Sequence, residues 1–139
     1  MRDLKQLCKM LAQLSIFLSS IVLGIMLFFS FVVAPVTFHS LDEENARKFI
    51  RKIFPFYYQV NFVLCAFTTL TYFFQKIFNI NFYLILFVTI LFFVSNYILM
   101  PLINKYRDNN QNKKFKYIHF TSVLINFIQI IILIFLLIY

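Results

Sequence analysis

Residues 117–139, YIHFTSVLINFIQIIILIFLLIY, form an apolar run of 23 residues without one charged side chain. A helix needs about 20 residues to cross a hydrocarbon core about 30 Å thick, so this run is long enough to span a membrane. Backbone groups in lipid must be satisfied within the segment, and a run of Ile, Leu and Phe without polar alternation favours a helix over a barrel strand. The stretch therefore predicts a transmembrane helix.

Three earlier stretches have the same character. Uncharged intervals of 32, 23 and 28 residues lie at 10–41, 53–75 and 77–104. The chain is 62% hydrophobic and 13% charged, and its mean hydropathy of +0.83 is far above that of an ordinary soluble domain. We therefore predict an all-α, integral membrane four-helix bundle that forms a single membrane domain over residues 1–139. Its spans are expected at about 11–36, 55–75, 80–103 and 117–138.

Basic residues are distributed unevenly between the two sides of this bundle. The two long connections, 39–56 and 105–116, hold nine Lys and Arg residues, whereas the termini and the short turn near Lys76 hold four. Because basic loops tend to remain in the cytoplasm, we expect both long loops there and both termini outside. The expected location is a bacterial inner membrane.

The first long connection predicts a helix of its own. Residues 41–54, LDEENARKFIRKIF, begin with acidic residues and continue with basic ones, and the Phe and Ile residues lie on the opposite face. We expect a short interfacial amphipathic helix between the first and second spans that ends at Pro55. The alternative is a plain connector that anchors the bundle. The residues expected to contact anionic lipid headgroups are Arg47, Lys48, Arg51 and Lys52.

The fourth span carries polar side chains on one helical face. His119, Ser122, Asn126 and Gln129 follow one another at intervals of three, four and three residues. The second and third spans have similar faces. The candidate pocket residues are Asn61, Asn96, His119, Ser122, Asn126 and Gln129. One hypothesis is a polar intramembrane pocket for a small ligand or lipid, and the simpler one is that these amides only bond across helices.

The direction of this polar face determines which groups the fourth span should contact. If it points inward, the nearest polar neighbours of the fourth span should be Asn61, Thr68 or Asn96. The opposite face, represented by Val123 and Ile131, should meet lipid or a second copy of the chain in a homo-oligomer. The expected partner is a bilayer with anionic headgroups, and no nucleic acid is expected.

The only two histidines, His39 and His119, are both expected near the loop side of the membrane. Two histidines at similar depth could ligate haem or a metal, which would make the chain a membrane redox protein. Otherwise His39 is solvated and His119 donates a structural hydrogen bond, and no cofactor is needed. The sequence has no nucleophile–base pair, no glycine-rich phosphate loop and no paired carboxylates in a span, so nothing indicates an enzyme.

Four stretches of the chain resemble a known family. They are GIMLFFSFVVAPVTFHSL (24–41), FPFYY (54–58), NYILMPLINKYRD (96–108) and FKYIHFTSVLIN (115–126). In order and spacing they are similar to the four-helix membrane family that includes vertebrate transmembrane protein 205 and a bacterial domain of unknown function. The family tends to have a glycine pair and a basic residue after the histidine, where this chain has Leu23 before Gly24 and Phe120 after His119.

The resemblance implies a membrane-embedded fold and no particular activity. It also covers His119, Ser122 and Asn126 of the polar face. The leading interpretation is a multi-pass membrane protein of unknown biochemical role that binds a small ligand or lipid in its intramembrane pocket. The alternative is the haem- or metal-binding redox protein that would use His39 and His119.

Overall fold

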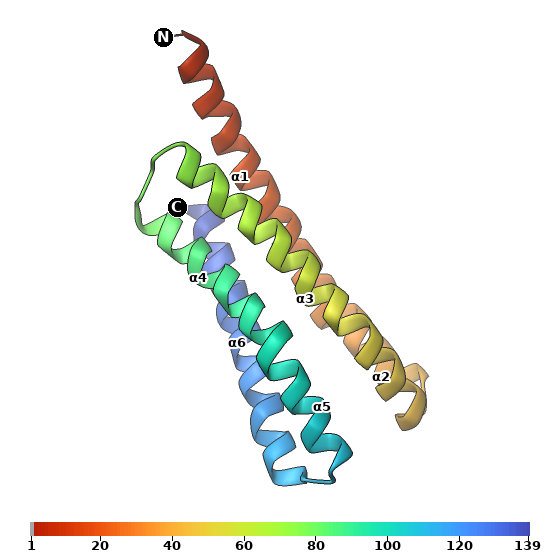
Figure 1. Cartoon of the computed structure of the whole chain (residues 1–139). Helices are drawn as coiled ribbons and strands as arrows, with labels where there is room; N and C mark the ends of the chain where they lie inside the picture. Colours follow the sequence, from red (N-terminus) through yellow and green to blue (C-terminus); the bar gives the residue numbers. More distant parts are fainter. Residues whose placement is uncertain (1) are drawn as a thin grey trace.

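Four long helices make up the protein in this computed structural model, which describes residues 2–139 and the side chains from Lys5 onward (Figure 1). When the short π-helical segments inside two of them are included, the helices cover Lys5–Ser40, Glu43–Phe74, Ile80–Asp108 and Asn112–Ile138. Each is long and apolar enough to cross a membrane. The predicted all-α, four-span fold class is confirmed, and the chain has the architecture of an integral membrane protein.

A proline shapes the end of the first span. This span consists of α1 (Arg2–Phe28), the five-residue π-helix η1 (Phe29–Val33) and α2 (Ala34–Ser40). Pro35 has no N–H, and in a regular helix its ring would collide with the carbonyl four residues earlier. The π turn is wider, and here the Ala34 N–H donates to the carbonyl of Phe29, five residues back. The helix therefore continues past the proline.

The third span repeats this design. It consists of α4 (Ile80–Val94), the π-helix η2 (Ser95–Leu99) and α5 (Met100–Asp108). Pro101 lies two residues after η2, as Pro35 lies two residues after η1, and the Met100 N–H donates to the carbonyl of Ser95. The chain is thus two helical hairpins of the same order, each pairing a π-interrupted span with an uninterrupted one. The uninterrupted spans are α3 (Glu43–Phe74) and α6 (Asn112–Ile138).

The predicted helix end at Pro55 is wrong, because α3 is one continuous helix of 32 residues. It starts at Asp42, whose carboxylate accepts the backbone N–H of Asn45 (2.9 Å), and this bond holds the pKa of Asp42 below its ordinary value. Prolines are tolerated inside membrane helices when the neighbouring packing holds the chain. Residues 43–54 therefore form the first turns of the second span instead of a separate interfacial helix.

The four spans pack as a ring in which α3 contacts α1 and α4, and α6 contacts the same two helices. Consequently α3 and α6 occupy opposite corners. Apolar side chains such as Met26, Ile85 and Phe92 are fully buried between the helices. On the outward face of α6, Ile131 is 51% exposed, as a lipid-facing surface requires, whereas Val123, 52% exposed, borders a cavity at one end of the bundle.

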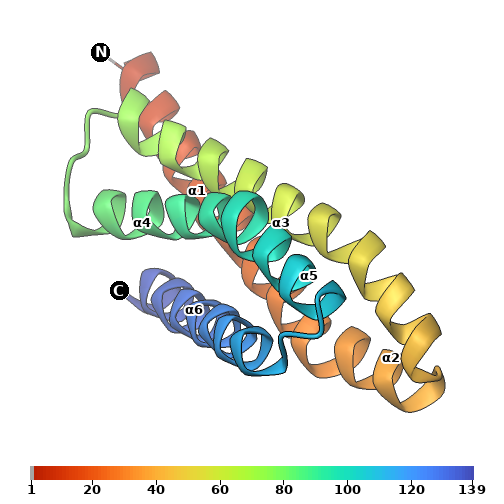
Figure 2. The ribbon, with the colours of Figure 1, turned by 60° about the horizontal axis from the view of Figure 1, so that its bottom comes forward.

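The two ends of the bundle differ (Figures 1 and 2). Both termini and the α3–α4 turn lie at one end, and the α2–α3 and α5–α6 turns lie at the other. At this second end the two turns are apart in both views, with α2 and the start of α3 on one side and α5 and the start of α6 on the other. We call it the loop end.

Candidate functional site

A cavity of about 560 Å³ lies between the two hairpins at the loop end. Its volume falls within the roughly 300–1,000 Å³ that is usual for small-molecule sites. The walls come from η1, α2 and α3 of the first hairpin and from α5 and α6 of the second. Most of the lining is apolar. Its charged side chains lie toward the helix ends at the loop end, and we call this part of the cavity the mouth.

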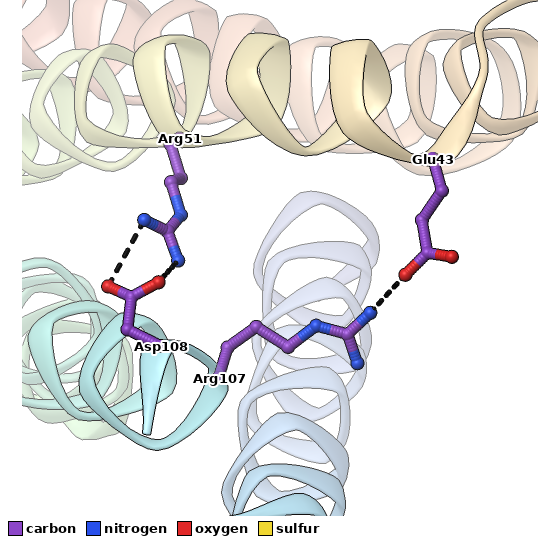
Figure 3. Close-up of polar contacts among 4 residues, drawn as sticks. All are labelled: Glu43, Arg51, Arg107 and Asp108. Atoms are coloured by element: carbon purple, nitrogen blue, oxygen red, sulfur yellow. Dashed lines mark hydrogen bonds and ion pairs between the residues drawn. The ribbon is translucent and has the colours of Figure 1, made fainter. Parts of the chain in front are cut away.

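Three arginines line the mouth of the cavity: Arg47 and Arg51 of α3 and Arg107 of α5. Arg51 donates to both carboxylate oxygens of Asp108, with an Nη1–Oδ2 distance of 3.2 Å. Arg107 Nη2 donates to Glu43 Oε1 at 2.5 Å (Figure 3). Arg47 forms no ion pair within the part of the chain that the structure describes. One guanidinium group is therefore available to an incoming anion.

The two ion pairs that join α3 to α5 are easily opened. The Arg51 and Arg107 side chains are 32% and 31% exposed, and their partners Asp108 and Glu43 are 55% and 80% exposed. Ion pairs this accessible contribute little to stability, because water competes for both charges. A stronger anionic partner can thus take over the guanidinium groups at small cost.

The inner wall is aromatic. Phe29 of η1 packs against Phe54 and Tyr57 of α3, with ring centroids 5.1 and 4.3 Å apart. Tyr58 adds a further edge contact with Tyr57 at 5.1 Å. Tyr57 and Tyr58 are only 6% and 5% exposed. This part of the cavity suits hydrocarbon and offers little to a free ion.

A chain of hydrogen bonds closes the inner end. Tyr57 Oη donates to Asn126 Oδ1 at 2.8 Å, and Asn126 Nδ2 donates to Ser30 Oγ at 3.2 Å. We call Ser30, Tyr57 and Asn126 the floor triad. Because its members belong to η1, α3 and α6, the triad ties the two hairpins together directly beneath the cavity.

The structure places three of the six candidate pocket residues on the cavity wall, namely His119, Ser122 and Asn126. Asn61 and Gln129 are 0% exposed and lie deeper in the bundle. Asn96, in η2, is partly exposed and does not line the cavity. The polar faces predicted from the sequence are therefore divided between the cavity and the bundle centre.

The α6 amides form no direct hydrogen bond with the polar neighbours predicted for them. Asn126 bonds within the floor triad, and Gln129 Nε2 donates to the backbone carbonyl of Val88 in α4 at 3.3 Å. The expected partners were Asn61, Thr68 and Asn96. The difference follows from side-chain length. The long phenol of Tyr57 extends from α3 to α6 at the opposite corner of the bundle, whereas the short Thr68 side chain donates its hydroxyl to a carbonyl of its own helix.

The two histidines lie in different surroundings. His119 lines the cavity and stacks on Phe115, with ring centroids 5.7 Å apart. His39 is exposed near the end of α2 and does not line the cavity. Among the side chains that the structure describes, from Lys5 onward, no group of three His, Cys, Asp or Glu residues is arranged to hold a metal ion.

The four basic residues predicted to meet headgroups also separate. Arg47 and Arg51 line the cavity, whereas Lys48 pairs with Glu44 one turn away (2.6 Å) and Lys52 is exposed. Sequence reasoning missed Arg107, which comes from the other hairpin. It also missed Ser30 and Tyr57 of the floor triad. Pro35 is the signal that could have pointed to Ser30, since it follows the π turn to which Ser30 belongs.

The fold and the cavity define a four-span membrane protein whose two hairpins enclose a basic-mouthed, largely apolar site. The chain belongs to the family described as "Domain of unknown function (DUF4149)", whose model matches residues 17–112. This match includes the cavity walls from η1, α2, α3 and α5 and stops before those from α6. No curated protein and no solved structure matches the chain.

Replacing Asn126 with Leu tests whether the floor triad only holds helices together. If the triad is purely structural, the substitution should lower the stability of the bundle by on the order of 1 kcal/mol, because it removes two interhelical hydrogen bonds and each contributes roughly 0.6 kcal/mol in a membrane. Thermal unfolding in detergent measures this cost. Ser20→Ala is the matched control, since the Ser20 hydroxyl bonds only to its own helix. Unchanged stability together with lost ligand binding would instead make Asn126 a ligand group.

Proposed function

We propose that this protein binds an anionic amphiphile, specifically an anionic phospholipid, in the cavity between its two hairpins. The phosphate lies at the mouth among Arg47, Arg51 and Arg107, and the acyl chains lie along the aromatic inner wall. The observation that carries the proposal is the combination in one cavity of about 560 Å³ of three arginines at the mouth and apolar side chains within.

The geometry of arginine supports a phosphate ligand. A guanidinium group presents a planar fork of N–H donors that binds phosphate oxygens in pairs. Arg47 and Arg51 lie in the first turns of α3, and Arg107 lies at the end of α5, so all three are close to the ends of spans. Phosphates of a bilayer lie at this level, and Tyr117, 72% exposed near the same end, fits an interfacial position.

The inner wall supports a lipid over free phosphate. A small anion would reach the arginines and leave the apolar part of the cavity empty, whereas an amphiphile fills both parts. The Phe29–Phe54–Tyr57 cluster gives the acyl chains an apolar surface. The chemistry therefore favours a ligand with one anionic end and one hydrocarbon end.

Lipid titration of the purified protein tests the proposal. Delipidated protein in detergent is titrated with phosphatidylglycerol, phosphatidylcholine or inorganic phosphate, and bound lipid is counted by native mass spectrometry. We expect phosphatidylglycerol to bind at least about tenfold more tightly than phosphatidylcholine, which corresponds to about 1.4 kcal/mol. Equal affinity for both lipids would overturn the proposal. Displacement of phosphatidylglycerol by equimolar inorganic phosphate would reassign the site to free phosphate.

Glu43→Gln should raise the affinity for anionic phospholipid several-fold. The change removes the carboxylate that competes for Arg107, and an exposed ion pair of up to about 1 kcal/mol corresponds to roughly fivefold in affinity. Glu44→Gln is a matched control, because it changes the charge equally but its carboxylate pairs with Lys48 and does not line the cavity. An equal rise in both variants would show that only overall charge matters.

We further propose that the chain lies in a bacterial inner membrane with the loop end in the cytoplasm and both termini outside. Nine of the 13 basic residues belong to the loop end, which supports this orientation. The resemblance to the family of vertebrate transmembrane protein 205 is compatible with it and adds no activity. In this orientation the mouth of the cavity faces the cytoplasmic leaflet, whose anionic lipids attract basic residues.

Cysteine labelling tests the orientation. A single cysteine at Gln111, in a variant with Cys8 and Cys65 replaced, should be protected from an impermeant thiol reagent in intact cells and react after lysis. Gln111 is preferable to its neighbour Asn110, whose positive φ of 55° disfavours a substitution. A cysteine at Ile77, 39% exposed in the α3–α4 turn, is the opposite-side control. Labelling at position 111 from outside would reverse the topology.

A further inference from the structure

Two amide side chains inside the bundle carry an unpaired acceptor. Asn61 of α3 and Gln129 of α6 are both 0% exposed. Neither Asn61 Oδ1 nor Gln129 Oε1 accepts a hydrogen bond from any group of residues 5–139. Hydrocarbon offers no donor, and a buried carbonyl oxygen without one is costly. The cavity does not use these oxygens, since neither residue lines it.

A flip of either side-chain amide would not give its oxygen a hydrogen-bond donor. Asn61 Nδ2 donates to the carbonyl of Tyr57 at 2.8 Å, and Gln129 Nε2 donates to the carbonyl of Val88 at 3.3 Å. Exchanging oxygen and nitrogen in either side chain would place two carbonyl oxygens against each other. Both amide oxygens therefore remain acceptors that are directed away from the bonded carbonyls.

Each of the two amides lies about one helical turn beneath the floor triad. The Tyr57–Asn126 hydrogen bond joins α3 and α6, and both helices run from there away from the loop end (Figure 1). Asn61 follows Tyr57 by four residues and Gln129 follows Asn126 by three. At 1.5 Å per residue these steps are about 6 and 4.5 Å. Asn61 and Gln129 are thus both in the interior next to the floor triad, on the side away from the cavity.

We infer that Asn61 and Gln129 together bind a water molecule between their amide oxygens, at the centre of the bundle. One water offers two O–H donors, one for each oxygen, and buried waters typically bridge otherwise unsatisfied groups in this way. A metal cation is poorly matched, because the intervals 53–75 and 117–139 contain no carboxylate to compensate its charge. This site goes beyond the proposed lipid site and is separated from it by the floor triad.

Water-edited solid-state NMR of the labelled wild-type protein in bilayers tests the inference directly. Magnetisation that starts on water should reach the side-chain amides of Asn61 and Gln129. It should not reach the methyl groups of Leu133 within the same mixing time, although Leu133 is also 0% exposed. No transfer to either amide would overturn the inference.

A double-mutant cycle gives an independent readout. Asn61→Leu and Gln129→Leu should each lower the Tm in detergent. The decrease in Tm of the double variant should be clearly smaller than the sum of the two single decreases. The reason is that either single change already disrupts the shared water, so the second change has less left to remove. Additive losses would overturn the inference. Replacing Na⁺ or K⁺ by choline should leave the wild-type Tm unchanged, and an ion-specific shift absent from the double variant would assign a cation instead. Neither readout depends on the charge of the lipid headgroup, so failure here leaves the proposed function standing.

Discussion

Replacing Arg47, Arg51 and Arg107 together by Gln should lower the affinity of the cavity for anionic phospholipid on the order of 100-fold. Each basic residue near an anionic lipid surface contributes about 1 kcal/mol, and three such contributions amount to roughly two powers of ten. The three side chains line one mouth, so a single phosphate group can use all of them. Native mass spectrometry with phosphatidylglycerol measures the loss.

A second triple variant separates this site from general attraction to anionic lipid. Lys113, Lys114 and Lys116 lie at the same end of the bundle, are exposed, and do not line the cavity. Changing all three to Gln alters the net charge by the same amount. We expect this control to retain phosphatidylglycerol binding within a few-fold of wild type. Equal losses in the two triple variants would contradict a defined site at the arginines.

Tyr57→Ala should destabilise the bundle by about 3–5 kcal/mol, the range for removing a large buried aromatic side chain. Tyr57 is 6% exposed, packs on Phe29 and Phe54, and donates to Asn126 across the bundle. Its removal therefore opens a void where the two hairpins meet. Thermal unfolding in detergent, or unfolding by titration with a denaturing detergent, measures the effect.

Tyr57→Phe is the matched variant for this prediction. It keeps the ring packing and removes only the hydroxyl that donates to Asn126. We expect a loss on the order of 0.6 kcal/mol, as for one interhelical hydrogen bond in a membrane. If Tyr57→Ala costs no more than Tyr57→Phe, the aromatic cluster does not hold the hairpins together.

Much of the fold could be predicted from the sequence because lipid imposes a simple requirement. A long uncharged segment such as 117–139 can satisfy its backbone in hydrocarbon only as a helix. The sequence did not reveal that α3 continues through Pro55, because the usual effect of proline on a helix is overridden by packing on both sides of it. Nor did it reveal the π turns before Pro35 and Pro101. Each proline ring would collide with the carbonyl four residues earlier, and a helix can relieve that collision by a π turn or by a kink.

The candidate site was predictable only within single helices. Helical periodicity grouped His119, Ser122 and Asn126, and the structure puts all three on the cavity wall. Periodicity carries no information on which helices face each other, so it could not pair Tyr57 with Asn126 or bring Arg107 to the side of Arg47. Such contacts follow from the way the two hairpins diverge at the loop end.

Photo-crosslinking with an anionic phospholipid that carries a photoactivatable acyl chain shows directly whether lipid occupies the cavity. The protein is crosslinked in bilayers, and the modified residues are located by mass spectrometry. We expect crosslinks to concentrate on the inner wall, at residues such as Phe29, Phe54 and Met100. We also expect them to decrease strongly when the same probe carries a zwitterionic headgroup. Crosslinks spread evenly over outward residues such as Phe31 and Phe127, with equal yield for both headgroups, would contradict lipid binding in the cavity.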